Sequence, residues 1–171
     1  SILRISNYVG TGNEESLTRD DDQRFALIMA GGKGTRLREL TLKNPKPLIE
    51  VGERPLIEHI MSSIDYIGFK DFYLLCGYRS EAFYEYITTS QFNIKICEED
   101  FPLGTGGPFV KWVKDHSKSL SRTLKQRNNV PILIANGDLL FDLDSDIYSN
   151  FERSGARFAI VGRKITSEIK Y

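Results

Sequence analysis

A glycine-rich, basic segment follows the apolar run 25–29, and its sequence is Ala30-Gly31-Gly32-Lys33-Gly34-Thr35-Arg36-Leu37. Glycines let a backbone approach a ligand without interference from Cβ atoms, and the amides exposed in this way bind phosphate oxygens. Arg36 and, ten residues later, Lys46 add two positive charges. A guanidinium together with an ammonium is a common phosphate-binding combination. The segment, called the glycine loop (residues 30–37) from here on, therefore predicts the phosphate site of a nucleotide enzyme.

Two better-known phosphate-binding loops do not match the glycine loop. A Walker A loop requires Gly-Lys followed by Ser or Thr, whereas Gly34 follows Lys33 here. A dinucleotide-binding fingerprint requires Gly or Ala three residues after Gly34, where this chain has Leu37. An ordinary glycine-rich turn between a strand and a helix stays open as an alternative when this segment is taken alone.

A carboxylate, Asp138, follows the apolar run 130–135 in the sequence Asn136-Gly137-Asp138. Magnesium takes one or two protein carboxylates together with substrate phosphates, so one Asp at the end of a buried strand is a suitable ligand. The competing interpretation is a hairpin turn, because Asn-Gly is a common turn sequence. The acidic segment 139–146 is a poor pairing strand, so we predict Asp138 as a metal ligand.

A second glycine-rich segment, 101–107, contains Gly104 and Thr105 and precedes a predicted helix. Its backbone groups and the Thr105 hydroxyl suit the edge of a nucleotide base, while an ordinary strand-to-helix connection is an equal alternative for the segment alone. Acids at Asp142, Asp144 and Asp146 begin like a calcium loop, but the required glycine and the closing glutamate are both missing. We interpret the three acids as an acidic helix start.

Short apolar runs alternate with helical patterns from residue 25 onward, which is typical of βαβ units. We therefore predict an α/β fold with a doubly wound, mostly parallel sheet, a three-layer α/β/α arrangement and a Rossmann-like nucleotide-binding core. Ligands of such sheets bind outside the carboxyl ends of the strands, where the strand order reverses, so we expect the polar clusters in one crevice. The expected strands are 25–29, 71–76, 93–97, 130–135 and 157–161, and the expected helices are 55–67, 81–87, 107–116 and 145–152.

Length and charge restrict the remaining possibilities. The 171 residues fit one domain, with 1–24 as a linker or tail that is either the end of an upstream module or an arm on the main body. Basic and acidic residues balance at 23 each, which gives no global reason to expect nucleic acid or an anionic membrane as a partner. No apolar run reaches the roughly 20 residues of a membrane helix and no secretory leader is visible, so we expect a soluble, cytoplasmic protein. The two cysteines and the two histidines have no metal-binding spacing, and we expect packing roles for them.

Taken in order, these motifs resemble the sugar-phosphate nucleotidylyltransferases, also called nucleoside-diphosphate-sugar pyrophosphorylases. In appearance they are most similar to the mannose or heptose 1-phosphate guanylyltransferases. The resemblance implies transfer of a nucleotidyl group from a nucleoside triphosphate to a sugar 1-phosphate with release of pyrophosphate, and Mg²⁺ as the cofactor. It also implies that 25–171 is the nucleotide-binding part of a nucleotidyltransferase domain, truncated at its C-terminal side relative to the family. The matching segments are 27–37, 40–41 with 45–48, 102–107 and 136–138.

The resemblance further implies a role for each site residue. Arg36 would hold the triphosphate and the departing pyrophosphate, Lys46 the α-phosphate and Asp138 the metal. The nucleotide-binding residues would be Ala30, Gly31, Gly32, Gly34 and Thr35 in the glycine loop, with Gly104 and Thr105 beside the base.

Two departures from the family pattern keep other functions open. Glu39 stands where the family usually has proline, and the chain is shorter than family members. One alternative is a non-catalytic regulatory subunit that binds a nucleotide sugar, and another is nucleotidyl transfer to a non-sugar acceptor. The expected ligands are a nucleoside triphosphate and a sugar 1-phosphate, and homo-oligomerisation stays open.

Overall fold

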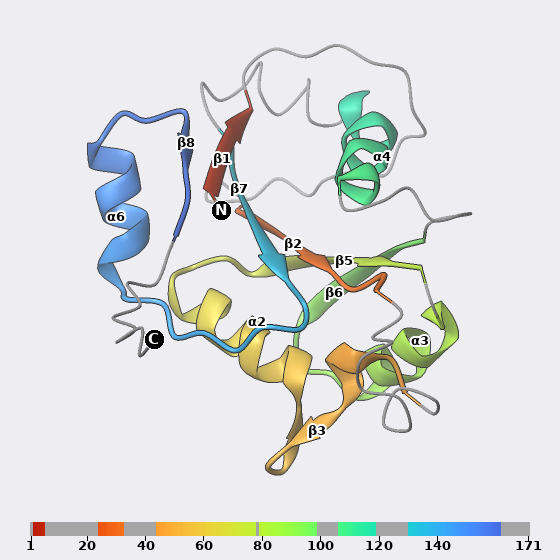
Figure 1. Ribbon diagram of the computed structural model, residues 1–171. Helices are drawn as coiled ribbons and strands as arrows, with labels where there is room; N and C mark the ends of the chain where they lie inside the picture. The colour runs from red at the N-terminus through yellow and green to blue at the C-terminus, as the bar shows by residue number, and fades with distance from the viewer. Residues whose placement is uncertain are drawn as a thin grey trace, which may run out of the picture.

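A six-stranded sheet, ordered β6-β5-β2-β7-β1-β8, forms the centre of the molecule (Figure 1). The structure is a computed structural model that describes residues 2–5, 24–32, 44–77, 79–98, 106–118 and 130–161. The strands of the sheet are β1 (Ile2–Ile5), β2 (Phe25–Met29), β5 (Asp71–Cys76), β6 (Asn93–Glu98), β7 (Val130–Asn136) and β8 (Phe158–Ala159).

The strand directions confirm the predicted doubly wound arrangement. β2 lies parallel to both β5 and β7, and β5 lies parallel to β6. The chain therefore runs outward from β2 through β5 to β6, and then returns to the other side of β2 to form β7. The strand order reverses between β2 and β7, which is where ligands bind in folds of this kind.

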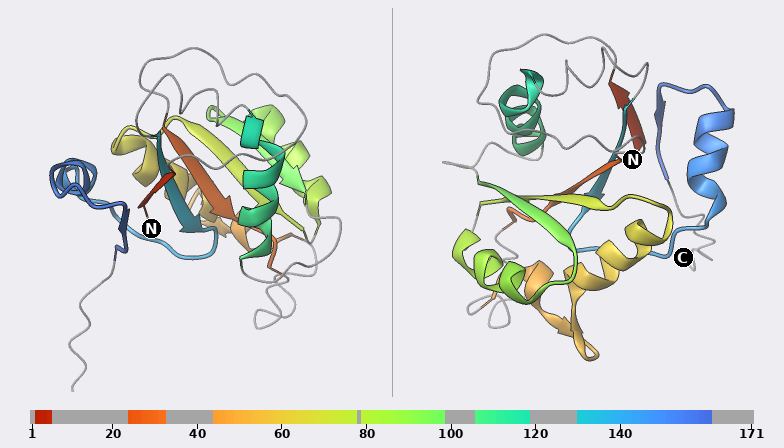
Figure 2. Two further views of the ribbon diagram at one scale, coloured as in Figure 1. Left: turned by 90° about the horizontal axis from the view of Figure 1, so that it is seen from above. Right: turned by 180° about the vertical axis from the view of Figure 1, so that it is seen from behind.

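Helices cover both faces of the sheet (Figure 2). On one face, α2 (Leu56–Tyr66), α3 (Ser80–Thr89) and α6 (Asp146–Arg153) contribute to a core with Ala26, Ile28 and Leu74 of the strands. On the other face, α4 (Gly107–Asp115) packs on Leu27 and Leu75. Neighbouring residues of β2 and β5 thus alternate between two apolar cores, as expected for central strands buried on both faces.

Helix α2 forms the centre of the larger core because its apolar residues recur at helical spacing. Its buried side chains are Leu56, Ile57, Ile60, Met61 and Ile64. The helix ends before Gly68, whose φ of +90° lies in the left-handed region that glycine adopts without penalty. The sequence signals at Pro55 and Gly68 therefore predicted both ends of this helix to within one residue.

Arg24 connects the end of α2 to α6. Its Nη1 atom donates a hydrogen bond to the Ile67 carbonyl oxygen at 3.4 Å, and its guanidinium carbon lies 4.1 Å from the centre of the Tyr148 ring. A cation is favourable both at a helix C-terminus and over an aromatic face. A Cβ atom at residue 68 would lie only 2.6 Å from Arg24 Nη1, so a larger residue there would displace the end of the Arg24 side chain.

We expect Gly68→Ala to lower the free energy of unfolding by about 2–3 kcal/mol, since alanine would be strained at positive φ and would also displace Arg24. Gly155→Ala is the matched control, because Gly155 has a φ of +64° but open space around its Cβ position, and it should cost only about 1 kcal/mol. Urea unfolding followed by emission of Trp112, the single tryptophan and a fully buried one, measures both. Equal losses in the two variants would contradict the role given to Arg24.

Several elements differ from the sequence-based expectations. Strand β8 covers only 158–159 of the expected 157–161, and a short hairpin of β3 (Glu50–Val51) and β4 (Arg54–Pro55) was not predicted. This hairpin precedes α2 and projects from the body (Figure 1). The segment β1, which belongs to the predicted linker or tail 1–24, pairs antiparallel with both β7 and β8.

The two cysteines lie on opposite faces of the sheet. Cys76 packs in the core beneath α2 and α3, whereas Cys97 packs beside the core under α4. Cys76 is buried, as expected, whereas Cys97 is only partly buried. Within the described residues, no helix is both long and apolar enough to cross a membrane.

Candidate active site

Half of the predicted site residues lie in the described part of the chain. Ala30, Gly31, Gly32, Lys46 and Asp138 can be located. The other predicted site residues lie outside the described residues, and they are Gly34, Thr35, Arg36, Gly104 and Thr105.

The chain leaves β2 and β7 at the same level of the sheet, because Met29 pairs with Asn136 in register. Gly137 N–H donates a hydrogen bond to the Met29 carbonyl oxygen at 2.9 Å, and Ala30 N–H donates to the Leu75 carbonyl oxygen at 2.9 Å. The start of the glycine loop is thus bonded to β5, and the turn after β7 is bonded to β2. The start of the glycine loop and the turn that carries Asp138 therefore lie at the same edge of the sheet, at the point of strand reversal.

Gly137 allows three segments to pack closely at this edge. A Cβ atom at this position would lie 2.9 Å from the Met29 carbonyl oxygen, 3.2 Å from Ile28 Cγ2 and 3.3 Å from Pro47 Cγ. Contacts below 3.0 Å with backbone are not tolerated without a shift. Only glycine therefore lets the turn that carries Asp138 sit directly against β2 and against the segment that carries Lys46.

We expect Gly137→Ala to lower the free energy of unfolding by about 1–3 kcal/mol, as overpacking at a rigid site does. Gly106→Ala is the control, because Gly106 has a φ of −94° and nothing near its Cβ position. Urea unfolding of the two variants measures the difference. Equal stability of Gly137→Ala and the wild-type protein would show that the three segments can move apart freely.

Lys46 is the first residue of a short helical turn, η2 (Lys46–Leu48), and it lies between Pro45 and Pro47. Leu48 N–H donates to the Pro45 carbonyl oxygen at 2.9 Å, and Ile49 N–H donates to the Lys46 carbonyl oxygen at 3.2 Å. Proline fixes φ at both flanking positions, and Pro47 is buried. The backbone of Lys46 is therefore positioned rigidly.

Lys46 Nζ lies 2.9 Å from Asp138 Oδ2, which joins two residues that are 92 positions apart in the sequence. Their side chains remain 31% and 52% exposed, respectively. An exposed ion pair of this kind contributes at most about 1 kcal/mol to stability, so a ligand can displace it. The structure thus brings together the two charged residues that the sequence singled out for the α-phosphate and the metal, although their direct contact was not foreseen.

The structure also decides between the alternatives at 136–146. Among the described residues, β7 pairs with β1 and β2, and the segment 139–145 forms no strand, which excludes the hairpin interpretation. Asp144 Oδ1 accepts a hydrogen bond from Asp146 N–H at 3.2 Å at the start of α6. This confirms the acidic helix start in place of a calcium loop, and within the described residues no group of three or more metal-ligating side chains occurs.

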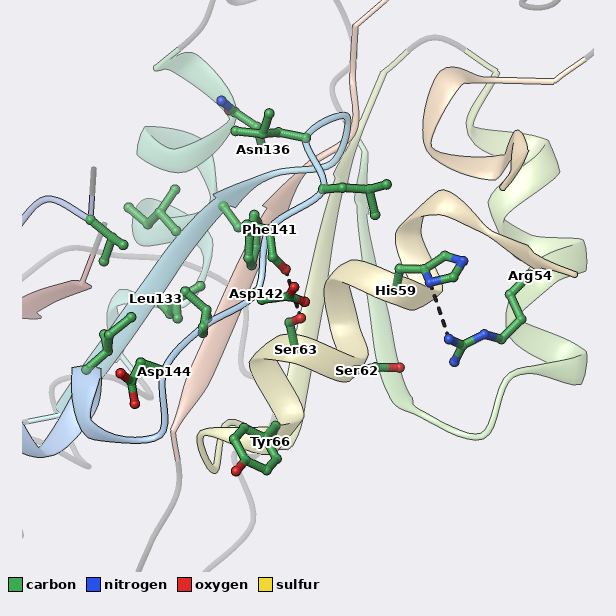
Figure 3. Close-up of a pocket in the computed structure, with 17 residues that line it drawn as sticks. Arg54, His59, Ser62, Ser63, Tyr66, Leu133, Asn136, Phe141, Asp142 and Asp144 are labelled. Carbon is green, nitrogen blue, oxygen red and sulfur yellow. Dashed lines mark hydrogen bonds between the residues drawn. The ribbon is translucent and has the colours of Figure 1, made fainter. Parts of the chain in front are cut away.

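A large open pocket of about 1530 Å³ lies between α2, β7 and the segment 139–144 (Figure 3). Ser63 on α2 bridges it, because its Oγ donates to the Phe141 carbonyl oxygen at 2.9 Å. Asn136 lines one end of the pocket, next to the turn that carries Asp138, whereas Lys46 and Asp138 are not part of its lining. This pocket could not be predicted from the sequence, because its walls come from segments about 80 residues apart whose approach depends on tertiary packing.

The histidines have packing roles, as expected. His59 Nε2 lies 2.9 Å from the Val51 carbonyl oxygen, so this nitrogen carries the proton and Nδ1 accepts from Arg54 Nη2 at 3.3 Å. His59 thereby attaches the β3–β4 hairpin to α2. His116 is buried and stacks on Trp112 with ring centres 4.8 Å apart.

Two features at the same sheet edge were not singled out by sequence. Arg79, just after β5, has a φ of 55°, which is uncommon for a residue with a side chain and occurs often at functional sites. Tyr84 of α3 lies near Glu98 at the end of β6. The pKa of its phenol is raised mainly by partial desolvation and to a lesser extent by the Glu98 carboxylate. Arg79 had no sequence signal, since only the backbone conformation distinguishes it.

Comparison with known proteins gives a consistent result. The family model described as "Nucleotidyl transferase" matches residues 25–168. The mannose-1-phosphate guanyltransferase of Debaryomyces hansenii is 34% identical over 154 residues, which cover 85% of this chain and 39% of that protein. The Saccharomyces cerevisiae enzyme of the same name is 33% identical over 150 residues with the same coverage. The chain thus spans about two-fifths of the length of these curated relatives.

Solved structures support the fold. HddC from Yersinia pseudotuberculosis complexed with GMP-PN is 25% identical, with a TM-score of 0.56, and the match covers 78% of this chain and 54% of that chain. A second HddC structure is 22% identical with a TM-score of 0.55. The predicted Rossmann-like α/β fold is therefore confirmed by the sheet topology and by these neighbours.

Proposed function

The chain belongs to the nucleotidyl transferase family, and from that premise we propose that this protein transfers a nucleotidyl group from a nucleoside triphosphate to a sugar 1-phosphate, giving a nucleoside-diphosphate sugar and pyrophosphate. The single observation that carries the proposal is the Lys46–Asp138 pair at the strand reversal, beside the start of the glycine loop. The curated relatives are named mannose-1-phosphate guanyltransferases, and HddC was solved with GMP-PN. Both favour a guanylyl group.

The residues of this chain supply charge and position in the proposed reaction. Phosphoryl transfer depends mainly on alignment of the reactants and on neutralisation of charge on the transferred group, with no covalent enzyme intermediate required. Lys46 would bind the α-phosphate oxygens, and Arg36 would bind the triphosphate and then the leaving pyrophosphate. The phosphate of the sugar 1-phosphate is itself the nucleophile, and because it is ionised at neutral pH it needs no strong general base.

Asp138 fits a magnesium site of the kind this family implies. Its carboxylate is half exposed, lies at the carboxyl edge of the sheet and adjoins the glycine loop. Magnesium commonly binds one or two protein carboxylates, with substrate phosphates and water completing its shell. Bound there, the ion would neutralise charge on the triphosphate. Asp138 would hold and orient it, and Lys46 would act on the neighbouring phosphate.

The proposal is tested by measuring pyrophosphate release from the protein with Mg²⁺, each nucleoside triphosphate and a panel of sugar 1-phosphates that also contains phosphocholine. We expect release with at least one sugar 1-phosphate, with GTP as the preferred donor. Release only with phosphocholine would favour a non-sugar acceptor. Tight binding of a nucleotide sugar without any turnover would favour a regulatory subunit.

A further inference from the structure

We propose that Lys46 serves as the counter-ion of Asp138 before metal binds, and that a divalent cation exchanges with this ammonium and so releases Lys46 to the nucleotide. This inference rests on the proposed function, because it concerns the same two residues. It adds an order to their use: the lysine that contacts the nucleotide becomes available only when the carboxylate takes up the metal.

Lys46 and a divalent cation would compete for the same carboxylate group of Asp138. Lys46 Nζ lies 2.9 Å from Asp138 Oδ2. A divalent ion bound at that oxygen would lie within a few ångströms of the ammonium, and like charges so close repel strongly unless one of them moves away. A divalent ion bound at that oxygen would therefore compete with the ion pair.

The Lys46–Asp138 ion pair is exposed enough to separate easily. Its side chains are 31% and 52% exposed, so the pair is weakly stabilising and water can solvate either partner after separation. A deeply buried pair would instead leave an unpaired charge in an apolar environment, which is costly. The exposure thus fits an exchangeable contact rather than a structural one.

The backbone around Lys46 can stay in place while the lysine side chain moves. Lys46 lies between Pro45 and Pro47 at the start of η2, and Gly137 packs against Pro47 and the Met29 carbonyl group. The lysine side chain has a flexible four-carbon stem, so Nζ can leave Asp138 without any movement of the strands. Release of Lys46 therefore requires rotation of one side chain only.

Exchange at Asp138 would couple the affinity for the metal to the affinity for the nucleotide. A ligand that draws Lys46 away removes the competitor at Asp138, so it raises the affinity for metal, and by linkage the metal raises the affinity for that ligand by the same factor. A triphosphate fits this description, because its oxygens bind an ammonium.

The test is a titration of the nucleotide-free protein with Mn²⁺, followed by electron paramagnetic resonance. We expect Lys46→Met to bind Mn²⁺ about 3–5-fold more tightly than wild type, since it keeps the stem and removes the competing charge. Lys46→Arg keeps a cation, so its affinity for Mn²⁺ should match that of wild type. Asp138→Asn should abolish Mn²⁺ binding at this site, both alone and in combination with Lys46→Met. The inference is overturned if Lys46→Met binds no more tightly than wild type, or if Asp138→Asn leaves Mn²⁺ binding unchanged.

A matched ion pair controls for the change in net charge. Lys111 Nζ lies 2.9 Å from Asp115 Oδ2 on α4, with side chains 33% and 49% exposed, nearly the same as for Lys46 and Asp138. Lys111→Met removes the same charge and should leave Mn²⁺ affinity as in wild type. An equal gain in affinity for Lys111→Met and Lys46→Met would show a general effect of charge and overturn the exchange.

A second readout follows the lysine itself. After ¹³C-methylation of the lysines, which preserves their charge, the Lys46 resonance is assigned by its loss in Lys46→Arg. Mg²⁺ should shift this resonance in the wild type toward its position in metal-free Asp138→Asn, and a resonance unmoved at saturating metal would overturn the inference. Both binding experiments are done without nucleotide, so their outcome does not depend on catalysis. Release of Lys46 by metal in a protein that forms no pyrophosphate would contradict only the proposed function. Formation of pyrophosphate by a protein whose Lys46 is not released by metal would contradict only this inference.

Discussion

Asp138→Ala is expected to reduce kcat/KM for pyrophosphate formation by on the order of 100- to 1,000-fold, the usual cost of removing a preorganised electrostatic group from an active site. The physical reason is that the carboxylate oxygen 2.9 Å from Lys46 would no longer hold a metal against the triphosphate. Stability should change little, because the side chain is 52% exposed. Initial rates measured over a range of Mg²⁺ concentrations check this, and added Mg²⁺ should restore part of the activity.

Asp115→Ala is the matched control for this variant. It breaks an ion pair of the same length and similar exposure on α4, so its effect on stability should equal that of Asp138→Ala, and its kcat/KM should stay within about twofold of wild type. Full activity of Asp138→Ala at limiting Mg²⁺ would remove Asp138 from the metal site.

Lys46→Ala is expected to lower kcat by on the order of 100- to 1,000-fold while KM for the nucleotide changes less. A charge that acts on the α-phosphate is most valuable when that phosphate becomes the transferred group in the transition state. Lys46→Arg should recover part of the rate, because it keeps the charge on a side chain of different shape. Steady-state kinetics at saturating Mg²⁺ give both constants.

Lys111→Ala controls for loss of a half-exposed lysine from an ion pair and should retain wild-type kcat. Loss in Lys46→Ala of nucleotide affinity alone, with kcat unchanged, would mean that Lys46 binds substrate and transition state equally well. That result would contradict its assignment to the transferred phosphate.

The parallel core of the fold could be predicted because its signals are local. The strands 25–29 and 71–76 have the predicted bounds, since a short apolar run between turn residues, too short for a typical helix, favours a buried strand. The ends of α2 followed from Pro55 and Gly68 in the same way. Their conformations depend on the residue itself and on nothing distant in the chain.

The elements that could not be predicted depend on contacts between distant segments. Strand β1 is defined by its pairing with β7, where Ile5 lies opposite Val130, and a four-residue apolar segment alone does not specify such a partner. Strands of two residues, as in β3 and β4, are too short to show an alternation of apolar and polar residues.

The same distinction applies to the candidate site. Asp138 could be singled out by its residue type and its position after a strand, because parallel strands bring their carboxyl ends to one edge. Lys46 could be singled out as a second positive charge ten residues after Arg36. The contact between Lys46 and Asp138 at 2.9 Å could not, since it depends on the close approach of Gly137 to Pro47. A glycine whose importance is steric has the same sequence signature as a glycine in any turn.

The most direct test of the central claim is ³¹P NMR of the protein with Mg²⁺, GTP and mannose 1-phosphate. The account predicts that the GTP signals are replaced by those of a nucleoside-diphosphate sugar and pyrophosphate, and that Lys46→Ala and Asp138→Ala slow this conversion together while Lys111→Ala does not. Conversion at an unchanged rate in both site variants, or cleavage of GTP to GDP and phosphate without any sugar product, would contradict it.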